Sequence, residues 1–461
     1  MRGADRVPRG VAANPVSIRT SFHRLVLACA AMGSLAGPAT AAGKPPPPSY
    51  GRPPAKAPAS HALDWPARVV FFPAWLVTQV VLRQPLGALV RGAESSETLQ
   101  KAQDSSSDGP LKELTILPAV RLDLGLKPMV GVNASWRYRR NLLDLQASTW
   151  GVGYVQARLG ETYRTRPDQD VSFETTVSRR KDTPFYGLGP RSLDEARTRF
   201  ESNTFRMQAG YTADFWRSSR IKAAFGGRGL WFGDGACCEE LSTHEAALSR
   251  NDFAPGLDQD YAAGFQRVEL ALDTRPITPT RGVAFRLEGF EEASFAVAGT
   301  QRGQEPRRGW IQYGGSLGAT IDLTGTRRML AVTVHTRFAD PLQGQVPFTD
   351  QAMLGGDDLM PGFLRGRLVD RSALVMNAQY TWPFWTFLDG MLQAAVGNVF
   401  AEHLRDVDVR AMRYSAGIGI RTKGNPASRF EALFAVGSKP FDEGGAIDSI
   451  RVLVGTQHGL F

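Results

Sequence analysis

The sequence lacks the long apolar runs that form membrane-spanning helices. Its 461 residues have a mean hydropathy of −0.22, and beyond the extreme N-terminus no run of about 18 uncharged apolar residues occurs. A bundle of membrane-spanning helices is therefore excluded. Charged residues make up 21% and aromatic residues 10% of the chain, which leaves enough apolar surface for an ordered fold.

Residues that commonly carry catalysis or bind metals are also scarce. The chain has three cysteines and six histidines, and the histidines show no spacing typical of metal ligands. It contains no phosphate-binding loop and no Cys-x-x-Cys motif. We therefore expect no enzymatic activity, no metal and no cofactor. Cys237 and Cys238 are adjacent, and we expect them to lie unreactive on a loop.

The net charge of +9 does not indicate a nucleic-acid partner, because most of it lies near the N-terminus. Residues 1–42 carry +4 and residues 43–60 carry +3, which leaves only +2 for the rest of the chain. No basic face is needed to explain the high isoelectric point. We expect no nucleic-acid binding.

The N-terminal part is organised as a targeting segment and two linkers. Residues 1–42 read as a secretory signal peptide, with a basic stretch, an apolar run and the small residues Ala39-Thr40-Ala41. A buried N-terminal helix and a lipid anchor at Cys29 are the alternatives. Residues 43–60 form a Pro-rich linker, and residues 94–114 form a polar linker.

Residues 61–93, between the two linkers, carry an apolar stretch that prolines interrupt. Its uncharged part, Val69 to Leu82, is too short to span a bilayer. We predict short amphipathic helices that lie at a membrane interface or plug a cavity. A core helix of a small periplasmic domain is the alternative. The aromatic residues that would mark the interface are Trp65, Phe71, Phe72 and Trp75.

From residue 115 to residue 461 the hydrophobic pattern has a period of two, which predicts β-strands. Between Ile311 and Leu323, apolar residues at odd positions alternate with polar or small residues at even positions. The polar face of such strands repeatedly carries Arg, Glu, Asp and Gln, which suits a hydrated lumen. Strands in a bilayer must close into a barrel, because an unpaired edge is not tolerated in hydrocarbon.

This pattern predicts an all-β fold, a transmembrane antiparallel β-barrel of sixteen strands preceded by a short helical segment. Sixteen strands of about ten residues leave room for alternating short turns and long outer loops. The stretches Gly233 to Asp260 and Ala339 to Arg365 are long enough to be such loops. A soluble periplasmic all-β domain is the alternative, since a sandwich also alternates.

Motifs in the second half of the chain carry a family resemblance. The strand-turn-strand stretch from Asp273 to Gly282, the pair of motifs Leu354-Gly355-Gly356 and Leu364-Arg365-Gly366, and the segment Gly397-Asn398-Val399-Phe400 occur in that order. They resemble the barrel of the BamA/TamA family, the bacterial surface antigen family. Phe461, a terminal aromatic residue, is also typical of outer-membrane strands.

The resemblance implies that Leu364, Arg365 and Gly366 lie on a long loop folded back into the lumen. The chain departs from the family pattern at Ala395, where an acidic partner of the loop arginine is expected, and at Arg367, where an aromatic residue is expected. Arg365 then needs another acceptor. The candidate lumenal partners are Glu288, Asp322 and Glu431.

The resemblance implies a place in the outer membrane, lipid as a partner, and the barrel assembly machinery as a partner during biogenesis. Only 72 residues separate Ala42 from Thr115, so the chain looks like a member without the periplasmic POTRA domains. Two functions remain open. The barrel assists the insertion or translocation of client proteins or lipids through a weak seam between its first and last strands, or it is a passive pore or structural protein.

Overall fold

A computed structural model describes residues 114–235, 237, 240–250, 254–275, 282–299, 308–323, 328–357, 359–385, 387–423 and 429–457. The predicted segments 1–42, 43–60 and 61–93 lie outside these residues, as does the linker 94–114 except for its last residue. Cys238 and Phe461 also lie outside them. Among the described residues, no helix combines the length and apolarity needed to cross a membrane.

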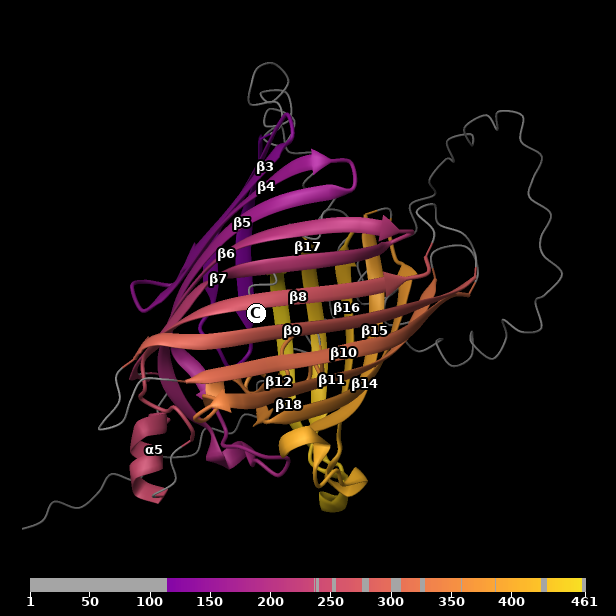
Figure 1. Ribbon diagram of the computed structural model, residues 1–461. Coiled ribbons are helices and arrows are strands. Elements are labelled where there is room, and N and C mark those ends of the chain that lie inside the picture. The colour runs from indigo at the N-terminus through magenta and orange to yellow at the C-terminus, as the bar shows by residue number, and fades with distance from the viewer. Residues whose placement is uncertain are drawn as a thin grey trace, which may run out of the picture. The chain divides into compact units, whose positions relative to one another are not determined.

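The described chain forms a closed antiparallel β-barrel of sixteen strands (Figure 1). The barrel strands are β1 (Leu114–Asp123), β2 (Met129–Tyr138), β3 (Asn141–Thr149), β4 (Tyr154–Arg166), β5 (Gln169–Phe185), β6 (Thr198–Trp216), β7 (Ser219–Asp234), β8 (Tyr261–Asp273), β9 (Val283–Gly299), β10 (Gly309–Asp322), β11 (Met329–Gln343), β14 (Ser372–Pro383), β15 (Leu388–Phe400), β16 (Arg413–Thr422), β17 (Arg429–Ser438) and β18 (Ile447–Gln457). Each strand pairs with its neighbours along the chain, and β1 closes the ring against β18. The predicted fold class is confirmed.

The predicted alternation sets the two faces of the wall. In the register of β9, β10 and β11, Ser316 lies opposite Glu288 on one side and His335 on the other. Leu317, the next residue, lies opposite Leu287 and Val334. Leu317 is 60% exposed and Ser316 only 7% exposed. The apolar side chains therefore face outward and the polar ones face the lumen, as in the wall of a membrane barrel.

Strands β5 to β11 are longer than the ten or so residues assumed for a membrane strand. β6 has 19 residues, and β5 and β9 have 17 each. This changes the predicted loop boundaries, because β7 continues to Asp234 and β11 continues to Gln343. The two ends of the barrel also differ. One, the turn end, carries the two-residue turns of β2–β3, β4–β5 and β6–β7; the other, the loop end, carries longer connections and helix α5 (Thr243–Arg250) (Figure 1).

The segment 344–371, called the lumenal loop below, connects β11 to β14 and enters the barrel. It contains a two-stranded sheet of β12 (Ala352–Leu354) and β13 (Leu368–Asp370). Apolar side chains of the loop pack on lumen-facing residues of β14 and β15. The cluster consists of Ala352, Leu354, Leu359, Met360, Phe363, Leu368, Ala373, Val375, Ala395 and Val399. The lumen thus holds a packed apolar core beside its polar wall.

Candidate functional site

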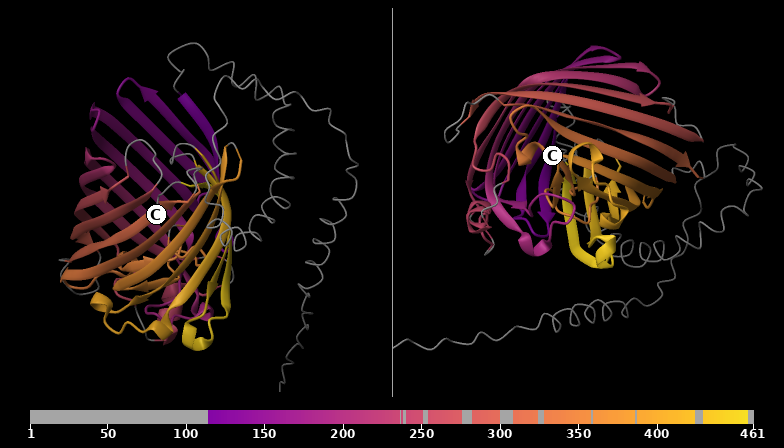
Figure 2. Two further views of the ribbon diagram at one scale, coloured as in Figure 1. Left: turned by 90° about the vertical axis from the view of Figure 1, so that its right-hand side faces the viewer. Right: turned by 60° about the horizontal axis from the view of Figure 1, so that its bottom comes forward.

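The junction of β1 and β18, called the closing seam below, has the shortest register of the barrel junctions as far as the described residues go. Its register contains three pairs, Arg121–Gly455, Leu122–Val454 and Asp123–Leu453. By contrast, β18 pairs with β17 over ten positions, from Arg429–Gln457 to Ser438–Ile447. Residues 114–120 of β1 pair with β2 but, within the described chain, with no residue of β18. The pairs formed by described residues therefore lie in the half of the seam nearest the loop end. Figure 2 shows the indigo and yellow strands meeting there.

A buried ion pair spans this short pairing. The guanidinium of Arg451, on β18, donates from Nε to Oδ1 of Asp123 on β1 at 2.7 Å and from Nη2 to Oδ2 at 2.6 Å. The side chains of Asp123 and Arg451 are only 2% and 3% exposed. A two-pronged, charge-assisted interaction of this kind is strong and fixes the relative position of the two strands.

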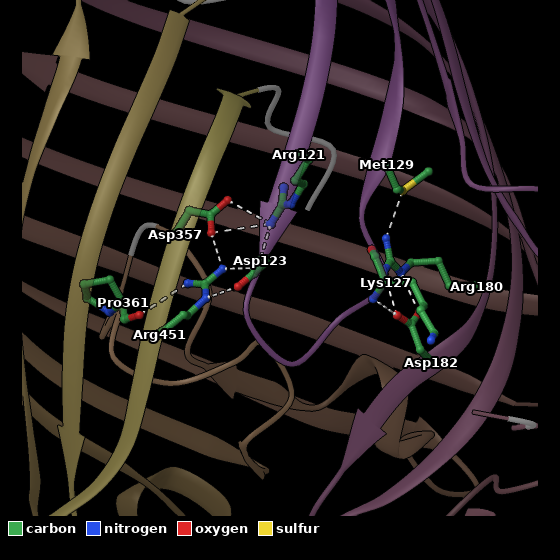
Figure 3. Close-up of polar contacts among 9 residues, drawn as sticks. All are labelled: Arg121, Asp123, Lys127, Met129, Arg180, Asp182, Asp357, Pro361 and Arg451. Carbon is green, nitrogen blue, oxygen red and sulfur yellow. Dashed lines mark hydrogen bonds and ion pairs between the residues drawn. The ribbon is translucent and has the colours of Figure 1, made fainter. Parts of the chain in front are cut away.

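Asp357, from the lumenal loop, joins the two sides of the seam (Figure 3). Its carboxylate accepts from Nη2 of Arg451 at 2.6 Å and forms an ion pair with Nη2 of Arg121 at 3.1 Å. Burial raises the pKa of the Asp357 carboxyl, but the charges of Arg121, Arg451 and Arg365 outweigh burial and hold this pKa below its ordinary value. Arg121, Asp123, Asp357 and Arg451 are called the seam cluster below.

The turn that follows β1 is held from its other side by β5. Asp182 accepts from the backbone amide of Lys127 at 2.7 Å and from Nε of Arg180 at 3.0 Å. Arg180 also reaches the sulfur of Met129, the first residue of β2, at 2.9 Å (Figure 3). The loop-end tip of the β1–β2 hairpin is therefore fixed on both sides, whereas the pairs described for the turn-end half of β1 are those with β2.

The lumenal loop is anchored at both of its ends. Near its start, Asp350 pairs with Nη2 of the buried Arg228 on β7 at 3.0 Å. Further along, the amide of Gly362 donates to the Ser415 hydroxyl of β16 at 2.8 Å, and the Ser449 hydroxyl of β18 donates to the Gly362 carbonyl at 2.7 Å. The loop thus bridges the long-stranded wall and the closing seam.

The structure places the predicted motif Leu364-Arg365-Gly366 on this loop. Leu364 is buried and lies against the turn after β1, where its Cδ1 is 3.1 Å from the position of a Cβ added to Gly125. Gly366 has φ of 81°, and a Cβ there would lie 3.0 Å from the Pro184 carbonyl oxygen, so a side chain is disfavoured. Arg365 lines a lumenal cavity of about 360 Å³ together with the seam cluster.

The proposed lumenal partners of Arg365 lie at separate positions on the wall. Glu288, on β9, accepts from the Ser316 hydroxyl at 3.0 Å and from Nε of Arg286 at 2.6 Å. Glu431, on β17, is buried opposite Arg421, and Asp322 ends β10. The charge of Arg365 lowers the pKa of the Asp357 carboxyl, a group of the lumenal loop that the sequence analysis did not single out.

Arg367 is a buried residue that sequence reasoning recorded only as a departure from the family pattern. Its side chain is 2% exposed and donates to the Ser192 hydroxyl at 2.7 Å and to Asp448 at 3.1 Å. Its guanidinium also lies 4.7 Å from the centre of the Tyr186 ring. Arg367 therefore ties the lumenal loop to the β5–β6 connection and to the start of β18. Arg367 directly follows the Arg365-Gly366 motif, and this position is the sequence feature that could have indicated its role in the loop.

The structure also shows the surroundings of Ala395 and the bonding state of Cys237, two residues named in the sequence analysis. Ala395, which stands where the family carries an acidic residue, is 2% exposed and lies in the apolar cluster with Phe363. A carboxylate there would be buried among hydrocarbon, so the alanine suits this loop. Cys237, expected as an unreactive thiol, is disulfide-bonded.

Comparisons with solved structures find barrels of similar shape. BamA from Haemophilus ducreyi lacking POTRA domains 1–3 aligns with a TM-score of 0.48 and 12% identity over 75% of this chain and 70% of that one. CdiB from Escherichia coli aligns with a TM-score of 0.48 and 12% identity, over 76% and 63%. CdiB from Acinetobacter baumannii aligns with a TM-score of 0.45 and 10% identity, over 74% and 59%. No family model and no curated protein matches the sequence.

The closed ring of sixteen antiparallel strands decides the architecture. The strand number and the ring closure are those that the resemblance drawn from the sequence motifs implies. With identities of 10–12% and TM-scores below 0.5, the comparisons assign neither a family nor an activity.

Proposed function

We propose that this BamA/TamA-like barrel lies in the outer membrane and assists the insertion or translocation of proteins or lipids by opening sideways at the closing seam. One observation carries the proposal. The seam has three backbone pairs and is held in place by a buried ion cluster. Elsewhere in the wall, the backbone pairing itself is long.

The distribution of contacts along the seam suggests how opening proceeds. The described pairs of β1 with β18 lie in the loop-end half of β1, so in this proposal opening begins at the turn-end half, where another strand or a lipid enters beside residues 114–120. Widening then meets the ion pair of Asp123 and Arg451. Asp357 adds the lumenal loop to this junction, so movement of the loop weakens the seam and opening of the seam releases the loop.

A passive pore is the competing function. The occupation of the lumen argues against a wide open channel, because the apolar cluster around Leu354, Phe363 and Leu368 packs on β14 and β15. The lumenal charges are also largely committed to ion pairs in which one or both partners are buried, including Arg228–Asp350 and Asp123–Arg451. A passive pore whose ion selectivity is set by hydrated lumenal side chains is therefore the less supported function.

A seam closed by a disulfide tests the proposal. Leu122 and Val454 are register partners across the seam, and Phe434 and Val452 are partners across β17–β18. We suggest Leu122→Cys with Val454→Cys as the test and Phe434→Cys with Val452→Cys as the matched control, each with the native cysteines replaced by serine. The purified proteins go into vesicles, and two rates are measured: insertion of a urea-denatured barrel protein and exchange of fluorescent lipid between leaflets.

Oxidation of the seam pair is expected to reduce at least one of the two rates to that of protein-free vesicles, and reduction to restore it. The β17–β18 pair should be indifferent to oxidation. If the seam pair behaves like the control, lateral opening is wrong. A steady ionic conductance that is unchanged by the seam disulfide would favour the passive pore instead.

A further inference from the structure

The turn end of the barrel carries a concentration of arginine beside outward-facing aromatic residues. The three two-residue turns there connect β2 to β3, β4 to β5 and β6 to β7, and they lie on neighbouring strands. Residues at or next to these turns include Tyr138, Arg139, Arg140, Arg166, Pro167, Asp168, Trp216, Arg217 and Ser218. This set is called the basic rim below. It contains four arginines and one aspartate, a net charge of +3.

The charges of the basic rim are accessible and are not cancelled by neighbours. Arg139, Arg140 and Arg166 are exposed, and none of them forms an ion pair with a carboxylate in the part of the chain that the structure describes. The carboxylates of Asp170 and Asp214, which lie close to the rim, are already paired with Arg164 at 3.3 Å and with Arg220 at 3.2 Å.

Aromatic side chains place these arginines at the edge of the apolar belt. Tyr138 and Tyr163 are 46% and 45% exposed, and Phe215 is 55% exposed, each near the turn end of its strand. Aromatic residues of membrane barrels collect at the level of the lipid headgroups. Side chains one or two residues beyond them, at the tips of the turns, therefore reach the phosphate layer.

The backbone conformation of two of these turns also places an arginine beside an aromatic ring. Arg139 and Arg217 occupy turn positions with φ of 51° and 49°, where glycine or asparagine is the usual residue. Each guanidinium lies over the ring of the preceding aromatic residue, 5.2 Å from the centre of Tyr138 and 4.9 Å from that of Trp216. Two separate turns thus repeat one arrangement, an aromatic residue followed by an arginine in the left-handed conformation.

We propose that the basic rim is a binding surface for anionic phospholipid, with phosphatidylglycerol as the headgroup chemistry it fits. The arginines supply hydrogen-bond donors and charge for the phosphate, and the adjacent aromatic side chains contact the glycerol and upper acyl region. The surface lies at the end of the barrel where β1 begins and β18 ends, so it selects lipid of the leaflet on that side. Its role is independent of lateral opening.

Native mass spectrometry of the purified full-length protein in micelles tests this surface. The protein is incubated with an equimolar mixture of dihexanoyl-phosphatidylglycerol and dihexanoyl-phosphatidylcholine, and bound lipids are counted. We expect the native protein to prefer phosphatidylglycerol. Arg139→Gln with Arg140→Gln should lower that preference about fivefold for each arginine removed. Arg139→Lys with Arg140→Lys should retain most of it, because charge is kept.

The matched control is Arg405→Gln with Arg410→Gln, two exposed arginines in the β15–β16 connection at the loop end. It should leave lipid preference unchanged, and a shift of each variant on a gel after boiling shows that the barrel is folded. Equal binding of the two lipids by the native protein, or an equal loss in the control, overturns the proposal. Displacement of the bound lipid by millimolar inorganic phosphate would show a site for free anions. Displacement by polyglutamate at the same concentration as the lipid would show a site for an acidic protein. Either result overturns the proposal.

Discussion

The closing seam and the β5–β6 junction are two strand junctions of one barrel, and different interactions hold them together. β5 and β6 pair over fifteen positions, from Gln169–Ala213 to Phe185–Thr198. The seam pairs over three and relies on the buried ions of Asp123, Arg451 and Asp357. Long backbone pairing distributes the stabilisation over many hydrogen bonds and depends little on any single side chain. An ion cluster depends on a few atoms, so a change in one of them acts on the whole junction.

The largest effect is expected from removing one member of the central ion pair. Arg451→Ala leaves the Asp123 carboxylate buried beside an unfilled space, and breaking a buried pair in this way costs about 3–5 kcal/mol. The loss should concentrate at the seam. Urea unfolding followed by heat-modifiability on a gel measures the total, and hydrogen exchange resolves whether the amides of β1 and β18 lose protection first. Uniform loss of protection around the ring would contradict a seam held chiefly by these ions.

Acidification should weaken the seam through Asp357. Since the pKa of this carboxyl lies below its ordinary value in the folded protein, the folded state binds the proton less tightly than the unfolded chain. Its stabilising contribution is fully present above the ordinary carboxyl pKa of about 3.9 and is lost as the pH falls below it. Losing charge-assisted bonds of this kind costs about 1.5–3 kcal/mol.

Asp357→Asn is the control for this pH effect. Hydrogen exchange of the seam amides, measured at several pH values, should show an acid transition in the native protein that is smaller in the variant. If both proteins lose protection identically, the transition belongs to other carboxyl groups.

A smaller effect is expected where the lumenal loop turns before Asp357. Gly355 has φ of 98°, and a Cβ there would lie 2.3 Å from the Leu364 carbonyl oxygen, so Gly355→Ala strains the backbone and displaces the loop. We expect a loss of about 1–3 kcal/mol in the free energy of unfolding, measured in urea. Gly151→Ala tests the effect of φ alone, because its φ is 87° and no atom lies within 4 Å of the added carbon. Equal losses would show that the contact with Leu364 adds nothing.

The smallest effect is expected in the wall away from the seam. Arg158, on β4, forms an ion pair with Glu174 on β5 at 2.8 Å, but both side chains are 28% exposed. Arg158→Ala should cost no more than about 1 kcal/mol by urea unfolding, since water screens the pair and the backbone bonds of β4–β5 remain. A loss as large as that of Arg451→Ala would remove the distinction between the two kinds of wall.

The fold was predictable because side chains of a membrane barrel alternate between its two faces, so that apolar and polar residues alternate along each strand. The alternation of Ile311 to Leu323 is sufficient to assign the lumenal and lipid faces of β10. The sequence pattern indicates only part of the seam cluster. Arg121 and Asp123 stand on the polar face of their strand, but nothing local identifies Arg451 as the partner, because 328 residues separate it from Asp123. Ring closure creates that proximity, and period-two patterning carries no information about it.

The lumenal loop shows a second limit of sequence reasoning. A family motif directed attention to Arg365, whereas buried contacts formed by Asp357 and Arg367 attach the loop to the wall. Charged residues in a loop predict exposure by default. Their burial here follows from arginines and carboxylates on distant strands, and those distances depend on the finished barrel.

The separation of Asp123 and Arg451 along the chain also orders the events of biogenesis. The ion pair cannot form until the last strand has been synthesised and brought beside the first. The complete cluster also needs Asp357 inside the lumen, because this residue bonds to Arg451 from the lumenal side. A chain that closed with the lumenal loop left outside would bury Arg451 with one carboxylate fewer and be less stable. The complete cluster therefore exists only when the ring is closed and the lumenal loop is inside it.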